Sequence, residues 1–138
     1  MKKVILSEMA EITPRFSEVD SLGIVWHGNY LKYFEDGREA FGAKYNLGYL
    51  EVFNQGFLTP LVKINCDFKK ILKYGDKAII KATYIDCEAA KITFKYLILR
   101  IVLPKQSIMT FLVYCNGFKL LTFFFNWSEN FTLSLTSK

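Results

Sequence analysis

Cysteine and histidine are scarce in this chain, and their scarcity argues against two classes of protein. Among 138 residues there are three cysteines and one histidine. Three cysteines far apart, with no CxxC pair and no neighbouring histidine, fit neither a zinc site nor a disulfide framework. No apolar run approaches the roughly 20 residues of a membrane-spanning helix, and the N-terminal apolar run is too short for a signal peptide. We therefore expect no metal site, no membrane partner and a reducing, cytoplasmic setting.

Charged residues are also few, at 22%, whereas hydrophobic residues make up 51% and aromatic residues 17% of the sequence. That balance excludes a disordered chain, and the length suggests one domain with a substantial core. The sequence contains no repeat and no linker, so we treat residues 1–138 as a single domain. One domain of this size has little room to bury so many rings, which favours a homodimer or a homotetramer.

The net charge of +5 indicates an anionic partner without naming it. The lysines are scattered and no nucleic-acid-binding motif is present, so nucleic acid is not the favoured partner. The densest cluster, Lys69, Lys70, Lys73 and Lys77, spans a predicted turn. Judged by its charge alone, that cluster is an ordinary solvated turn.

The spacing of apolar residues predicts one long helix among strands. Aromatic residues recur three, four and seven positions apart from Tyr30 to Tyr45, which indicates an amphipathic helix from Asn29 to about Gly48. The expected strands are residues 3–14, 57–68, 77–85, 91–102, 108–114 and 119–127, with turns at Lys73–Asp76 and at Asn116-Gly117. This order predicts an α+β fold in which an antiparallel sheet curls around one helix.

The single histidine, His27, lies where this helix begins, seven residues after Asp20. Gly28 lets the chain turn into the helix, whose first N–H groups have no partner within the helix. Those donors, at the positive end of the helix dipole, suit an anion or a polarised carbonyl. A carboxylate opposite such donors is an arrangement for acyl transfer, in which it attacks the carbonyl or activates water.

Ordinary structural roles also explain these residues. Asp20 is typical of a turn in which its carboxylate accepts loop N–H groups, and His27 is typical of a helix cap or of a buried, hydrogen-bonded ring. Glu35 and Arg38 have the spacing of a surface ion pair. Glu35 lies beside the aromatic face, however, where a carboxylate needs a partner. Spacing alone favours the structural roles for Asp20 and His27.

A longer motif changes this balance. Residues 16–39 read F-x-E-x-D-x-x-G-I-V-x-H-x-N-Y-x-x-Y-F-E-x-x-R-E, and Tyr74-Gly75-Asp76 follows later in the chain. This pattern resembles the 4-hydroxybenzoyl-CoA thioesterase family of hotdog-fold proteins, over about the first hundred residues.

The resemblance implies a hotdog fold, dimers formed by sheet extension, and hydrolysis of an acyl-CoA thioester. It implies that Asp20 is the catalytic nucleophile or general base, with the main-chain N–H groups around His27 and Gly28 polarising the carbonyl. The residues around this junction that we expect to bind substrate are Trp26, Asn29, Tyr30 and Glu35. For the coenzyme A phosphates we expect Lys69, Lys70 and Lys73, and because coenzyme A is part of the substrate we expect no separate cofactor.

The resemblance fades over residues 103–138, which lack the glycine-rich strand and the proline usual in relatives. Two other functions therefore stay open: a hotdog hydratase or dehydratase acting on enoyl thioesters, and a hotdog protein that binds acyl thioesters without cleaving them. The acyl group also stays open between small, medium and aromatic, because apolar walls discriminate weakly. Whether the carrier is coenzyme A or acyl-carrier protein is likewise unsettled by sequence.

Overall fold

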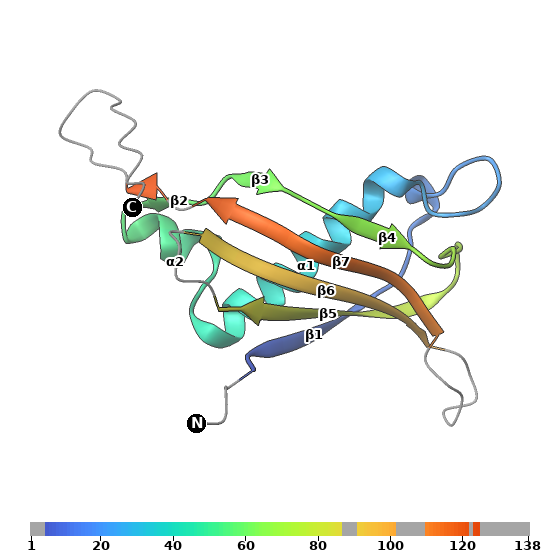
Figure 1. Cartoon of the computed structure of the whole chain (residues 1–138). Coiled ribbons are helices and arrows are strands. Elements are labelled where there is room, and N and C mark those ends of the chain that lie inside the picture. The colour runs from blue at the N-terminus through green and yellow to red at the C-terminus, as the bar shows by residue number, and fades with distance from the viewer. Residues whose placement is uncertain (1–4, 87–90, 102–109, 122, 125–138) are drawn as a thin grey trace.

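A computed structural model describes residues 5–86 and 91–101 in full and residues 110–121 and 123–124 at the level of the backbone. The helices and strands follow the order β1 (Ser7–Ile12), η1 (Phe16–Glu18), η2 (His27–Asn29), α1 (Tyr30–Tyr45), α2 (Tyr49–Asn54), β2 (Phe57–Leu58), β3 (Leu61–Lys63), β4 (Cys66–Phe68), β5 (Lys77–Ile85), β6 (Lys91–Ile101), β7 (Thr110–Leu121) and β8 (Phe123–Phe124). Here η1 and η2 are single 3-10 turns. One long helix crosses a curved sheet, as Figure 1 shows.

The sheet is antiparallel throughout, with the strand order β1-β5-β6-β7-β3, and β4 pairs with β7 beside β3. Helix α1 packs on one face of this sheet, against β1 and β5. The described strands and helices thus confirm the expected α+β class, with one long helix and an antiparallel sheet.

Helix α1 forms because its aromatic residues fall on one stripe, as the spacing predicts. Phe34 and Phe41 are fully buried on that stripe, and Phe34 stacks on Tyr96 of β6 with ring centroids 5.1 Å apart. The helix ends at Tyr45, and the next residue, Asn46, takes a left-handed conformation with φ +54°, a common way to stop a helix. Burial of this stripe holds the helix in place across the sheet.

The expected strand at residues 57–68 is wrong in detail. The structure divides it into β2, β3 and β4, of which β2 pairs with β8 while β3 and β4 both pair with β7. Pro60, which has no N–H to donate, lies in the first interruption. Helix α2, which lies between α1 and β2, is not among the elements that the sequence predicts.

The turn expected at Asn116-Gly117 is wrong as well. Strand β7 runs through both residues without a break, and it contains parts of both strands expected at 108–114 and 119–127. In its pairing with β6, Phe118 lies opposite Phe94 and Asn116 opposite Lys95, which leaves Gly117 unmatched. Gly117 is therefore a β-bulge, and glycine at a bulge has the same local sequence as glycine in a hairpin turn.

Most of the divergent segment at residues 103–138 lies outside the described residues, so the difference expected there stays a prediction. Among the helices of the described ranges, none has the length and apolar character that crossing a membrane requires.

A glycine sets how closely α1 approaches the sheet. A Cβ atom at Gly37 would lie 2.8 Å from Cγ1 of the buried Ile80. Replacing glycine with alanine inside a helix normally stabilises the helix by about 0.5–1 kcal/mol. We expect Gly37→Ala to do the opposite and to destabilise the protein by about 1–3 kcal/mol, because α1 and β5 must separate. Urea unfolding measures the change in the free energy of unfolding, and a stabilised Gly37→Ala variant would contradict this prediction. Glu39→Ala, at an exposed site on the same helix, is the control and should change stability by less than about 0.5 kcal/mol.

Candidate active site

The segment that leads into α1 folds back on itself as a tight hairpin. Val19 pairs with Val25, and the N–H of Asp20 donates to the carbonyl of Ile24 at 2.9 Å. Gly23 closes the turn in a left-handed conformation with φ +71°. In Figure 1 this hairpin is the blue loop that projects beyond the start of α1. The hairpin fixes the position of Asp20 just ahead of the helix.

The Asp20 carboxylate is partly exposed and takes part in the turn. Its Oδ1 accepts the N–H of Leu22 at 2.8 Å and that of Ile24 at 3.4 Å. This is the structural role that spacing alone favours for Asp20. None of the described residues donates a hydrogen bond to Oδ2, so the second oxygen is available to a reactant. Turn formation therefore uses one oxygen of the carboxylate, Oδ1.

The hairpin is fastened to the helix through Glu18. The main-chain carbonyl of Glu18 accepts the N–H of Trp26 at 3.0 Å and the side-chain N–H of Asn29 at 2.8 Å. Its carboxylate accepts the hydroxyl of Tyr33, from the first turn of α1, at 2.8 Å. Glu18 belongs to the motif, but its role could not be predicted from the sequence, because these partners lie 8, 11 and 15 residues away and only folding brings them together.

The helix starts with the 3-10 turn η2, which runs directly into α1. The first hydrogen bonds of this turn come from the N–H of Asn29, which donates to the carbonyl of Trp26 at 2.9 Å, and from that of Tyr30, which donates to His27. The N–H groups of His27 and Gly28 donate to no described residue. These two main-chain donors are the ones that the sequence predicts for polarising a carbonyl.

The side chains beside these donors are accessible. The Trp26 ring lies against Gly28, so that a Cβ atom at Gly28 would come within 1.9 Å of it. Trp26 is 53% exposed. The His27 ring is exposed as well and lies 4.8 Å from the Trp26 ring, centroid to centroid. His27 is thus not the buried imidazole that one interpretation expects, and the small size of Gly28 leaves room for the Trp26 ring beside it.

Three other residues expected to bind substrate have partners within the protein. Asn29 is buried and bonded to Glu18, and the hydroxyl of the buried Tyr30 accepts the N–H of Leu72 at 3.3 Å. Burial is the main cause that raises the pKa of Tyr30. Glu35 is 44% exposed and accepts the Nε–H of Arg38 at 2.7 Å, the surface pair that its spacing favours. Their role in binding substrate remains a prediction.

The three lysines expected to hold phosphates lie on the segment between β4 and β5. Lys73 pairs with Ile24 in an antiparallel bridge, which joins this segment to the hairpin that carries Asp20. Lys69, Lys70 and Lys73 all have exposed side chains, and Lys69 lies 4.0 Å from Asp67. The structure therefore joins the lysine segment to the Asp20 hairpin, although the two are far apart in sequence.

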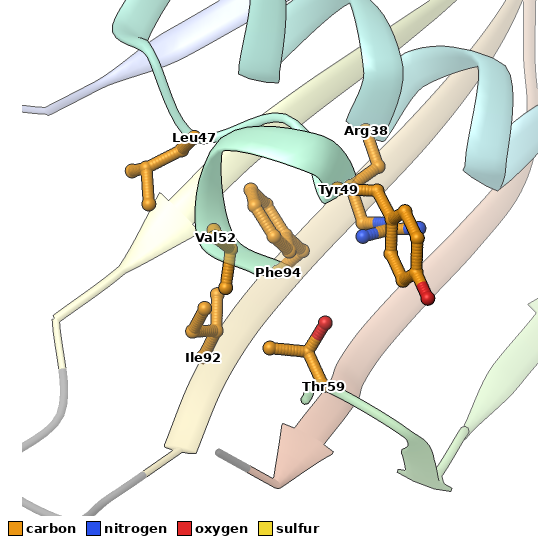
Figure 2. A pocket seen from close by; sticks show the side chains of 7 residues that line it. All are labelled: Arg38, Leu47, Tyr49, Val52, Thr59, Ile92 and Phe94. Carbon is orange, nitrogen blue, oxygen red and sulfur yellow. The ribbon is translucent and has the colours of Figure 1, made fainter. Parts of the chain in front are cut away.

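A separate pocket lies between the two helices and β6, as Figure 2 shows. Its lining residues are Arg38, Leu47, Tyr49, Val52, Thr59, Ile92 and Phe94. The Arg38 side chain lies beside the Tyr49 ring. This pocket was not predicted from the sequence, because α2 was not. The spacing of Tyr49 and Phe53, whose rings stack 6.0 Å apart, is nevertheless that of one helix face.

Comparison with known proteins identifies the family. A family model described as the thioesterase-like superfamily matches residues 14–117, a range that includes the hairpin, both helices and most of the sheet. The chain belongs to this superfamily. Its curated relatives include YneP of Bacillus subtilis, provisionally named an acyl-CoA thioesterase, with 38% identity over 86 residues. Those residues are 62% of this chain and 62% of YneP, so the match spans less than two thirds of that relative.

Solved structures of thioesterases share the fold. The 1,4-dihydroxy-2-naphthoyl-CoA thioesterase Slr0204 of Synechocystis has a TM-score of 0.75 and 17% identity, covering 93% of this chain and 90% of its own. The 4-hydroxybenzoyl-CoA thioesterase of Pseudomonas sp. strain CBS-3 has a TM-score of 0.71 and 19% identity, covering 83% of both chains. At these identities the likeness concerns the fold alone, and it confirms the expected hotdog arrangement.

Proposed function

We propose that this protein hydrolyses an acyl-CoA thioester to the free acid and coenzyme A. The observation that carries the proposal is the junction before α1. There, Oδ2 of Asp20 accepts no hydrogen bond from a described residue, and the N–H groups of His27 and Gly28 donate to none. The hydrogen bonds of the hairpin hold the segment that carries Asp20 next to the start of the helix. Membership of the thioesterase-like superfamily supports the same function.

In the proposed reaction, the thioester carbonyl accepts hydrogen bonds from the N–H groups of His27 and Gly28. These donors stabilise the negative charge that develops on the carbonyl oxygen during attack. Asp20 either attacks the carbonyl carbon to form an anhydride, which water then opens, or removes a proton from the attacking water. In both routes the C–S bond breaks, the thiolate leaves and takes up a proton, and the acyl group becomes a carboxylic acid.

The exposed ring of Trp26 provides an apolar surface beside these donors, and we infer that it contacts the acyl or pantetheine part of the substrate. Asn29 and Tyr30, which are buried, follow in the chain, and Glu35 lies further along the same helix. Small, medium and aromatic acyl groups are all compatible with it, because apolar surfaces discriminate weakly. No separate cofactor takes part in the proposed reaction.

The central prediction concerns the Asp20 carboxylate. The amide introduced by Asp20→Asn keeps an oxygen that accepts the N–H groups of Leu22 and Ile24, so the hairpin should persist and the melting temperature should change little. We expect kcat to fall about 10²- to 10⁴-fold, because the variant has no nucleophile or base. Release of the coenzyme A thiol from short, medium, long and aromatic acyl-CoAs measures this.

Asp36→Asn, at an exposed carboxylate on α1, is the matched control and should retain turnover. Near-normal turnover by Asp20→Asn would contradict the assignment. Loss of enoyl absorbance without thiol release would favour a hydratase, and binding of acyl-CoA without turnover would favour a non-catalytic binding protein.

A second prediction concerns the phosphates of coenzyme A. We propose that Lys69, Lys70 and Lys73 attract them, and exposed charge pairs contribute about 0.2–1 kcal/mol each. Replacing all three with glutamine should therefore raise KM for an acyl-CoA about tenfold, equal to about 1.4 kcal/mol. KM for the corresponding acyl-pantetheine thioester, which has no nucleotide, should not change.

The triple variant Lys44, Lys81 and Lys91 to glutamine removes the same charge elsewhere on the surface and should leave both KM values unchanged. An equal rise of KM for the two substrates in the first triple variant would show that these lysines do not recognise the nucleotide.

The third prediction concerns assembly. We propose a homodimer or homotetramer formed along β3 and β4, whose outer edges pair with no other described strand. Val62 there is 51% exposed, and an apolar open edge favours pairing with a second copy. Sedimentation should show a dimer or tetramer, and Val62→Lys should lower the mass, whereas Met9→Lys on the opposite edge strand, 50% exposed, should not. A monomeric unsubstituted protein would contradict the proposal.

A further inference from the structure

Glu18 connects the two halves of the proposed active site. It lies two residues before Asp20, and its carbonyl accepts the N–H of Trp26, the residue that precedes the helix, at 3.0 Å. The same carbonyl accepts the Asn29 side chain at 2.8 Å. Asn29 directly follows Gly28, so one oxygen atom links the base of the hairpin to both sides of the His27–Gly28 donors.

The carboxylate of Glu18 adds a second connection, further into the helix. Its Oε2 accepts the N–H of Arg15, which closes the turn η1, and the hydroxyl of Tyr33, both at 2.8 Å. Tyr33 is 3% exposed, so its ring is packed in the core and fixes where the hydroxyl lies. Burial first, and the Glu18 carboxylate second, raise the pKa of the Tyr33 hydroxyl well above its ordinary range, so it remains a donor.

Both ends of the site are thereby tied to α1. Among the described residues, the hairpin beyond Glu18 is also held by its own short-range bonds, by main-chain bonds to Leu72 and Tyr74, and by the buried side chain of Val25. The side-chain hydrogen bonds that join it to the start of α1 are those of Glu18. Without the Glu18 connections, the hairpin could shift relative to the helix while keeping its internal register. An error of about 1 Å in the placement of a reacting group can lower the rate about 100-fold.

We propose that Glu18 is a positioning residue, which acts through Tyr33 and Asn29 to hold Asp20 in register with the main-chain donors of His27 and Gly28. This inference rests on the proposed function, because Asp20 must be the reacting group. Glu18 itself touches no substrate in the proposed reaction.

The test removes one hydroxyl group. Tyr33→Phe keeps the buried ring and deletes only the bond to Glu18. We expect kcat to fall about 10- to 100-fold while KM for the acyl-CoA changes less than about twofold, because placement changes and binding does not. Tyr45→Phe is the matched control, since it deletes another tyrosine hydroxyl of α1, which donates to the carbonyl of Ser7 at 3.1 Å. Its kcat should stay within about twofold of the unsubstituted protein.

Two variants of Glu18 separate positioning from charge. Glu18→Gln keeps an oxygen that can accept both Arg15 and Tyr33, and we expect it to retain kcat within about threefold. Glu18→Ala should lose at least as much as Tyr33→Phe, and combining the two should lower kcat no further, because both remove the same connection. A rise in KM at unchanged kcat, or a Tyr33→Phe variant as active as Tyr45→Phe, would overturn the proposal.

Hydrogen exchange decides the matter without an assay of turnover. The N–H of Trp26 donates to the carbonyl of Glu18, so its exchange reports on the connection between the hairpin and the start of the helix. We expect this N–H to exchange faster in Tyr33→Phe than in Tyr45→Phe, and equal rates in these two variants would overturn the proposal. If the unsubstituted protein cleaves no acyl-CoA, the proposed function fails, yet the exchange rates still show whether Glu18 holds the hairpin.

Discussion

The side-chain amide of Asn29 is buried, with 7% of the residue exposed, and a buried amide destabilises a protein unless it is hydrogen-bonded. Its donor finds the main-chain carbonyl of Glu18 at 2.8 Å. This bond requires the segment before the helix to turn back on itself, because Glu18 precedes Asn29 by 11 residues. In the proposed account, the position of the hairpin and of Asp20 relative to the first helical N–H groups depends on this bond.

The same helix carries the core and the proposed chemistry. Phe34 and Phe41 anchor α1 to the sheet, and Gly37 permits the close approach to Ile80. Because the helix is fixed along its length, its first N–H groups are fixed as well. Donors held rigidly in this way stabilise a developing charge without reorganising during the reaction. The stability of the core therefore contributes to the geometry of the site.

Local patterns encode some parts of the structure, and those parts could be predicted. The helix follows from the spacing of its aromatic residues, and the junction of Asp20 with His27 and Gly28 follows from the motif. The partners of Glu18 could not be predicted, because hydrogen bonds to Asn29 and Tyr33 leave no periodic signal. The wrong expectations for the strands have a similar cause. Asn116-Gly117 is typical of a hairpin turn, yet pairing with β6 makes Gly117 a bulge within β7, and pairing partners are a property of the folded sheet.

The central claim is that the thioester carbonyl binds at the start of the helix, facing Asp20. A crystal structure with an acyl-CoA analogue in which a methylene group replaces the sulfur would test this directly, since the analogue keeps the carbonyl and cannot be hydrolysed. We predict that the carbonyl oxygen lies about 3 Å from the main-chain nitrogen of Gly28 or His27, with Oδ2 of Asp20 facing the carbonyl carbon or a water beside it. A carbonyl bound away from both the helix start and Asp20 would contradict the account.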